Sequence, residues 1–294
     1  AKIKKRAGWS NAGTTWKNRK SNHSLYLDGN PQYAQFDKSI VVGNTFTFAC
    51  WVKFDELGSS QRCIIGRNNS SGGNQLIIGA YSQPNHAWHV NLDDQSVSAD
   101  NTNFPIEEKK WYHIVVAFKE VSGTTEIRFY VNSVLAIDTT LNSTLDENAS
   151  TDKDWTIGAE YDGGSLSDHL KGNIDDLALW NTDLPESACL ALRKNKYHFD
   201  VTKDDGGSYV GFTNNLVVFY DFDDGFNSTE AGSAVGGDNT KATLHNGAKL
   251  MMKNPRQGDN YWPRNYEIQI DVTDVTPWAS PKESTLGTRY PIHS

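Results

Sequence analysis

Apolar and polar residues alternate most regularly between residues 172 and 180, which read GNIDDLALW. Alternation with a period of two is typical of a β-strand, because successive side chains of a strand point to opposite faces of the sheet. This pattern places Asp175 on the same face as Leu177 and Leu179, and it places Ile174 on the other face. A carboxylate on an apolar face is costly unless backbone N–H groups, a cation or water satisfies it. Asp175 is therefore the first candidate for a binding role.

The same alternation recurs in short segments that are separated by Gly, Asn, Asp and Pro. Residues 46–54 (FTFACWVKF) predict a central strand with one apolar face, on which Cys50 lies. The turn at residues 28–31 (DGNP) separates two short strands. Further strands are expected at residues 63–67, 75–81, 86–92, 96–99, 111–119, 125–137, 155–159, 216–222 and 242–250.

Helical and irregular segments are fewer. Residues 185–195 are the one good helix candidate, with Leu190 and Leu192 on its apolar side. Residues 141–154 are polar and predict a loop, and residues 161–167 (YDGGSLS) predict a flexible loop before the 172–180 strand. Many short strands joined by turns, with one short helix, indicate an all-β protein built as an antiparallel two-sheet sandwich.

Four motifs, in order, resemble the laminin G-like members of the concanavalin A-like lectin/glucanase superfamily. They are SLYLDGNPQYAQF (24–36), FTFACWVKF (46–54), KKWYHIVVAF (109–118) followed by EIRFYVNSVLA, and IDDLALW (174–180) followed by NTDLPES. The resemblance covers residues 22–192 and implies a jelly-roll sandwich whose closing strand leads into a short helix. It implies much less about function, because one fold supports many activities.

Residues 216–250 stand in an unusual place for this family. A similar segment commonly precedes the LYLDG motif in laminin G-like domains, whereas here it follows the closing strand. These residues either complete the sandwich as permuted strands or begin a second, truncated copy. We expect three parts: a basic N-terminal arm (1–20), the sandwich (21–252), and an extended C-terminal tail (253–294) that holds five of the nine prolines.

The charge is divided unevenly along the chain. Residues 1–20 contain seven basic residues and no acid. Because the whole chain has a net charge of −8, residues 21–294 together carry −15. An acidic body is not expected to bind nucleic acid broadly. The arm is expected to dock on an acidic protein, nucleic acid or lipid surface, or to be a solvated tail.

The sequence shows no long apolar segment. It has no run of 18 or more apolar residues, so no membrane span is expected. No apolar stretch follows the basic start, so either a signal peptide has been removed or the protein does not cross a membrane. The three cysteines leave at least one thiol unpaired; Cys50 is expected to be a buried thiol, and whether it pairs with Cys63 is left open.

Catalytic motifs are incomplete. The resemblance to glucanases implies two glutamates in a Glu-x-Asp-x-x-Glu pattern on one strand. Residues 160–165 (EYDGGS) provide the nearest match, but Ser165 replaces the second glutamate. We therefore expect that the protein is not an enzyme, with glycoside hydrolysis as the least favoured function.

The resemblance also implies a structural calcium ion. The matching ligands are Asp175, Asp28 and the carbonyl oxygen of Gly29, and calcium prefers six to eight such oxygens. The alternative is that backbone N–H groups alone satisfy Asp175. Carbohydrate- or partner-binding residues are not predicted.

The expected function is binding or assembly. Similar modules occur in structural proteins of marine phages, so the first expectation is a virion surface component that contacts other virion subunits, copies of itself or a cell-surface glycan. The alternative is a secreted, extracellular carbohydrate- or protein-binding module. Six N-glycosylation sequons fit that alternative, at Asn22, Asn68, Asn69, Asn142, Asn148 and Asn227.

Overall fold

The computed structural model describes residues 23–251 except 70–72, 83–85, 149–150, 163, 194–199 and 226–227. The predicted arm (1–20) and tail (253–294) lie outside the described residues. In the described part of the chain, no helix is long and apolar enough to cross a membrane.

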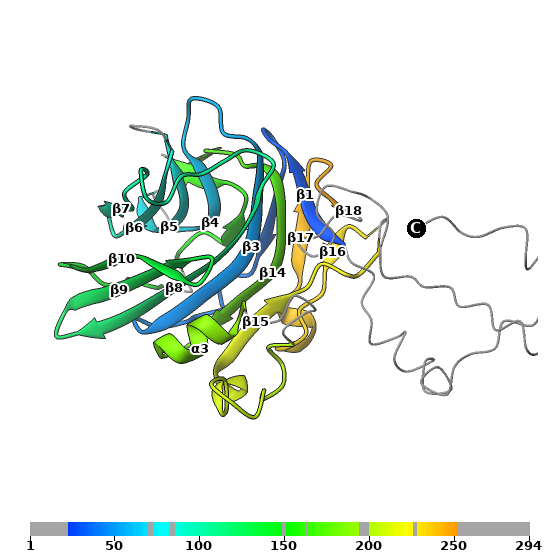
Figure 1. Cartoon of the computed structure of the whole chain (residues 1–294). Helices are drawn as coiled ribbons and strands as arrows, with labels where there is room; N and C mark the ends of the chain where they lie inside the picture. The colour runs from blue at the N-terminus through cyan, green and yellow to red at the C-terminus, as the bar shows by residue number, and fades with distance from the viewer. Residues whose placement is uncertain are drawn as a thin grey trace, which may run out of the picture. The chain divides into compact units, whose positions relative to one another are not determined.

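Two antiparallel sheets of eight strands lie face to face (Figure 1). Sheet I contains, in spatial order, β10 (Val134–Leu141), β9 (Thr124–Val131), β8 (Trp111–Val121), β3 (Phe46–Glu56), β14 (Lys171–Trp180), β1 (Ser24–Asp28) and β18 (Lys249–Met251), and β15 (Leu216–Tyr220) also pairs with β14. Sheet II contains β16 (Glu230–Ala231), β17 (Ala242–His245), β2 (Tyr33–Phe36), β11 (Trp155–Ile157), β4 (Arg62–Asn68), β5 (Asn74–Tyr81), β6 (Ala87–Leu92) and β7 (Gln95–Ser98). The prediction of an all-β jelly-roll sandwich is confirmed.

Smaller elements connect the sheets. The helix α3 (Glu186–Ala191) follows β14, as the sequence predicts, and two short 3₁₀ helices span Phe212–Asn215 and Gly237–Thr240. The prediction of a flexible loop at residues 161–167 is wrong in one respect, because β12 (Glu160–Asp162) and β13 (Ser165–Ser167) pair as a two-stranded ribbon. The side chain of Asn68 stabilises this ribbon by donating to the carbonyl oxygen of Tyr161 at 2.6 Å.

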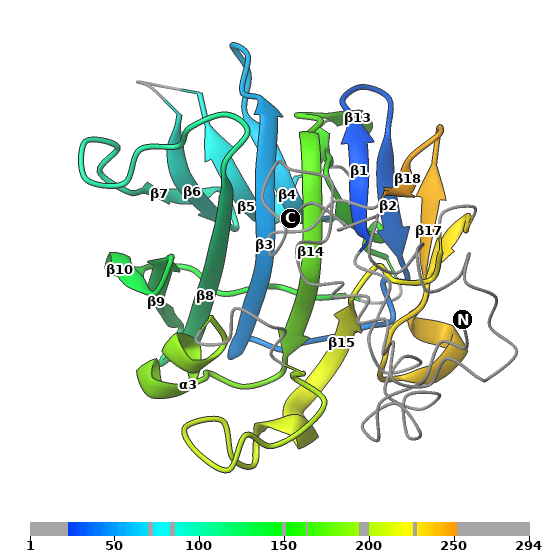
Figure 2. The same cartoon turned by 45° about the vertical axis from the view of Figure 1, so that its right-hand side comes forward.

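The closing strand β14 lies between β3 and β1 in sheet I (Figure 2). Its predicted alternation is interrupted: Asp175 pairs with Trp51, whereas Ala178 pairs with Ala49, so β14 carries one extra residue there. This is a β-bulge, and Asp176 within it has a φ of 47°. The bulge resets which residues face inward.

The predicted face of Asp175 is therefore wrong. Ile174, Leu177 and Leu179 all belong to the core between the sheets. Asp175 follows Ile174 directly and pairs with Trp51, which places it on the outer face of sheet I. The carboxylate does not share a face with the two leucines, because the bulge shifts the alternation by one residue.

Residues 216–251 contribute strands to both sheets. β15 pairs with β14, β18 pairs with β1, and β17 pairs with β2. Val218, Tyr220 and Leu250 are fully buried in the same core as the strands before the helix. These strands therefore belong to one sandwich with residues 24–180.

Two apolar clusters stabilise the fold. The larger cluster fills the space between the sheets, and the smaller one lies on the outer face of sheet I, where Ala188 and Cys189 of α3 pack with Ala49 and Val115. Cys50, Cys63 and Cys189 are buried free thiols, so Cys50 and Cys63 do not pair. Burial raises the pKa of the Cys189 thiol to about 12, which is the behaviour of a structural cysteine.

Replacing Leu250 by alanine is expected to lower the free energy of unfolding by about 2–5 kcal/mol, because this leucine is buried in the core. The matched control is Leu135→Ala on β10, where the side chain is 40% exposed and the loss is expected to stay below about 1 kcal/mol. Urea denaturation measures both. Equal losses would contradict the assignment of β18 to the core of the sandwich.

Candidate functional site

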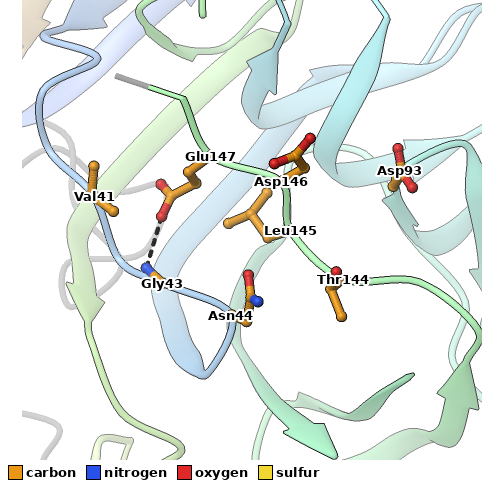
Figure 3. Close-up of a pocket in the computed structure, with 8 residues that line it drawn as sticks. All are labelled: Val41, Gly43, Asn44, Asp93, Thr144, Leu145, Asp146 and Glu147. Atoms are coloured by element: carbon orange, nitrogen blue, oxygen red, sulfur yellow. Dashed lines mark hydrogen bonds between the residues drawn. The ribbon is translucent and has the colours of Figure 1, made fainter. Parts of the chain in front are cut away.

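A hollow of about 550 Å³ lies at one end of the sandwich (Figure 3). Three segments that are distant in sequence surround it: residues 41–44 before β3, the turn between β6 and β7, and residues 144–147. The lining residues are Val41, Gly43, Asn44, Asp93, Thr144, Leu145, Asp146 and Glu147. Its volume lies in the range of about 300–1,000 Å³ that is typical of small-molecule sites.

Local sequence gives each segment its shape. Asp93 and Asp94 have φ angles of 48° and 61°, and two consecutive residues of positive φ make the tight hairpin turn between β6 and β7. The carboxylate of Asp93 accepts a hydrogen bond from the Ser143 hydroxyl at 3.2 Å, which connects this turn to the third segment. Leu145 is buried in the core and anchors that segment.

A buried charge network holds the segments together. The Glu147 carboxylate accepts a hydrogen bond from the backbone N–H group of Gly43 at 2.7 Å (Figure 3). It accepts another from the backbone N–H group of Val42 at 3.0 Å. The same carboxylate lies 3.4 Å from the Arg67 guanidinium, which lies 3.2 Å from the carboxylate of Asp152. Arg67 thus connects β4 in sheet II to two of the segments that line the hollow.

Burial determines the energetics of this network. The side chain of Arg67 is fully buried, and those of Glu147 and Asp152 are 4% and 2% exposed. Burial raises the pKa of Glu147, whereas the Arg67 charge lowers it. Because removing three charges from water costs about as much as their attraction returns, the network contributes less to stability than to fixing the loops.

The exposed part of the hollow is polar. Asp93, Asp146 and Asn44 are exposed, and Thr144 is half-buried. Val41 is 45% exposed and adds an apolar contact. Carboxylate, amide and hydroxyl oxygens accept hydrogen bonds, so the arrangement fits a ligand that is rich in hydroxyl donors.

Replacing Arg67 by methionine is expected to lower the free energy of unfolding by about 3–5 kcal/mol, because Glu147 and Asp152 would be left buried without their cation. The matched control is Lys119→Met. Lys119 pairs with Glu126 at the surface, where both side chains are about half exposed, so a loss of at most about 1 kcal/mol is expected. Denaturant unfolding of both variants tests the comparison, and a loss at Arg67 as small as at Lys119 would rule out a buried network.

The structure does not bring the predicted calcium ligands together. Asp28 pairs with Lys171 at one end of the β1–β14 ladder, whereas Asp175 is four residues further along β14, or about 13 Å away at 3.3 Å per residue. The Gly29 carbonyl accepts a hydrogen bond from Gln32 N–H at 2.7 Å. No group of three or more His, Cys, Asp or Glu side chains within the described ranges is arranged to hold a metal ion.

Asp175 has a backbone partner instead. Its carboxylate accepts a hydrogen bond from the N–H group of Asp176 at 2.9 Å, within the bulge. The set of Asp28, Gly29 and Asp175 therefore does not fit one calcium ion, and no role that depends on calcium is derived from it.

The residues that resemble a glucanase motif are not arranged for hydrolysis. Glu160 is 3% exposed, and its carboxylate accepts hydrogen bonds from the Ser167 hydroxyl at 2.8 Å and the Asn68 amide at 3.2 Å. Ser165 pairs with Asp162 across the β12–β13 ribbon. Both oxygens of Glu160 therefore accept hydrogen bonds within the protein.

Burial and the nearby carboxylate of Glu160 raise the pKa of Asp168 to about 6. The folded protein then keeps a proton that the unfolded chain releases, so this group makes stability fall as the pH rises from about 4 to about 6. Asp168→Asn is expected to remove that part of the decrease, and melting temperatures between pH 3.5 and 7.5 measure it. The control is Asp138→Asn at an exposed position of β10. A decrease that persists unchanged in Asp168→Asn would contradict the assignment.

The sequence did not identify the hollow. Its residues come from segments that each look like ordinary loops, and the one usable signal was Arg67, a charged residue at the end of the apolar run CIIGR.

The sequon at Asn68 is excluded as a glycosylation site, because this side chain is 1% exposed and donates hydrogen bonds to Glu160 and Tyr161.

Comparison with known proteins identifies the family. A family model described as the concanavalin A-like lectin/glucanases superfamily, of the laminin G type, matches residues 9–188. The chain therefore belongs to this superfamily. A comparison with curated proteins gave no match.

Several solved structures are similar to this chain at low sequence identity. A Bacteroides ovatus protein named for carbohydrate binding has a TM-score of 0.56 and 18% identity, covering 80% of this chain and 61% of its own. This chain thus corresponds to about three fifths of that protein. The CBM40 of the Ruminococcus gnavus IT-sialidase has a TM-score of 0.46 and 11% identity, and the match covers 58% of this chain and 96% of the CBM40. A pentraxin from Limulus polyphemus has a TM-score of 0.41 and 18% identity, and the match covers 60% of this chain and 77% of the pentraxin.

Proposed function

We propose that the protein is a non-catalytic glycan-binding module that uses the hollow at the end of the sandwich. The observation that carries this proposal is the set of hydrogen-bonding groups on a concave surface whose loops are fixed by the buried Arg67 network. A rigid site binds a flexible polar ligand more tightly, since less conformational entropy is lost on binding.

The chemistry of the lining favours a sugar. A sugar ring presents several hydroxyl donors around an apolar C–H face. The carboxylates of Asp93 and Asp146, the amide of Asn44 and the hydroxyl of Thr144 supply partners for the hydroxyl groups, and Val41 supplies an apolar contact. The Bacteroides ovatus protein of similar fold is itself named for carbohydrate binding, which supports the proposal by analogy.

Binding without catalysis fits the carboxylates best. Glycoside hydrolysis needs two carboxyl groups on either side of an accessible sugar bond. Asp168 has a raised pKa, as a general acid requires, but Glu160 beside it is buried and uses both oxygens within the protein. We expect no release of reducing sugar from laminarin, agarose or carrageenan.

The proposed setting is a virion surface, with an extracellular binding protein as the alternative. The basic segment 1–20 and the aromatic, proline-containing segment 253–294 supply the reason for an assembly role, because they provide charge and anchoring side chains for neighbouring subunits. Whether the protein assembles with copies of itself or with other virion subunits stays a prediction.

Thr144→Val is expected to weaken glycan binding by about tenfold, because the substitution keeps the shape of the side chain but removes a hydroxyl partner. Thr140→Val, at an exposed position of β10, is the matched control and is expected to bind as the wild type does. A glycan array identifies the ligand, and isothermal titration calorimetry with that ligand measures the variants. Absence of binding to every glycan on the array would refute the proposed function.

A second surface provides the main alternative location. Tyr81 at the end of β5 is 40% exposed and stacks on His89 with ring centroids 4.9 Å apart, and His89 Nδ1 lies 3.0 Å from the Ser98 hydroxyl. An exposed tyrosine beside polar groups offers a flat contact for a sugar ring. If Tyr81→Ala abolishes glycan binding while Thr144→Val leaves it unchanged, the ligand binds on this face of sheet II and the hollow is not the site.

A further inference from the structure

The charges around the hollow indicate which glycans it selects. Resting on the proposed function, we infer that the hollow binds neutral or amine-bearing sugars and discriminates against carboxylated and sulfated ones. The residues that line the hollow are acidic, and the buried Arg67 behind them is already paired with two carboxylates.

The lining is acidic. Among the eight residues that the structure places around the hollow, Asp93, Asp146 and Glu147 are acids, and none is Lys, Arg or His. Asp93 and Asp146 are exposed, so their carboxylates are available to a ligand. A site that binds anionic sugars needs cationic donors, most effectively the paired N–H groups of arginine.

Arg67 does not supply such donors. Its guanidinium is fully buried and lies 3.4 Å from Glu147 and 3.2 Å from Asp152. It also donates hydrogen bonds to the carbonyl oxygens of Ile40 and Lys38 and lies over the Trp155 ring at 4.9 Å. One arginine is thus shared by two carboxylates, so the network as a whole does not offer positive charge to the hollow.

The expected size of the discrimination follows from Coulomb's law. Two exposed carboxylates about 6 Å from a bound sugar carboxylate repel it enough to weaken binding by about tenfold in water at low salt. The same groups attract a protonated amine by a similar factor. Since both carboxylates face solvent, salt should reduce either effect.

A glycan array with matched pairs tests the inference. The pairs are N-acetyllactosamine with its 3′-sialylated and 6-sulfated forms, and fully N-acetylated chitotetraose with its free-amine form. In 20 mM salt, N-acetyllactosamine is expected to bind about tenfold more tightly than its sialylated and sulfated forms. The free-amine chitotetraose is expected to bind more tightly than the fully acetylated form, and both differences are expected to shrink in 300 mM salt.

Substitution then assigns the effect to the hollow. The double variant Asp93→Asn/Asp146→Asn keeps hydrogen-bonding oxygens but removes two charges, so the discrimination is expected to fall to about threefold or less. The matched control is Asp100→Asn/Asp138→Asn, which removes two exposed carboxylates outside the hollow and is expected to leave the discrimination unchanged.

The outcomes separate the two proposals. Equal or tighter binding of the acidic members by the wild type would overturn the charge selection while leaving glycan binding intact. Unchanged discrimination in Asp93→Asn/Asp146→Asn would overturn its assignment to the hollow. Absence of binding to all glycans would overturn the proposed function and the selectivity with it.

Discussion

The pairing of β14 with three other strands is the constraint on which the sandwich depends. β3 pairs along one edge of β14, and two strands share the other edge: β1 opposite residues 171–174 and β15 opposite residues 177–180. The bulge at Asp175 and Asp176 falls where the partner changes from β1 to β15. The backbone N–H group of His23 donates to Asp223 at 2.7 Å, which joins the start of β1 to the residues after β15.

The buried triad of Arg67, Glu147 and Asp152 fixes the positions of the loops relative to the paired strands. Arg67 belongs to β4, and its charge reaches Glu147, which in turn holds the backbone of residues 42–43. An apolar side chain at position 67 would fill the space without fixing loop positions, because dispersion is not directional. The charged network therefore fixes the positions of the loops that form the concave surface.

The fold by itself leaves the function open, since lectins and glucanases share it. The distinction lies in the use of carboxylates. Those of Glu160 and Glu147 are buried and hydrogen-bonded within the protein, whereas those of Asp93 and Asp146 face the solvent at the hollow. The buried carboxylates make contacts within the protein, and the exposed ones are the groups on which the proposed glycan binding rests.

The sequence by itself predicted the fold family and most of the strands, because the two-residue alternation is local and turn residues mark its ends. It was wrong to expect single strands at residues 125–137 and 242–250, because turns after Val131 and His245 divide each of them into two strands. It placed the 172–180 strand correctly but assigned Asp175 to the wrong face, since a bulge depends on how β3 and β14 pair and not on either strand alone. Only the tertiary structure separated Asp28 from Asp175, because strand register decides which side chains meet. It alone also assembled the hollow, whose residues 41–44, 93 and 144–147 are brought together by strand order and by one buried arginine.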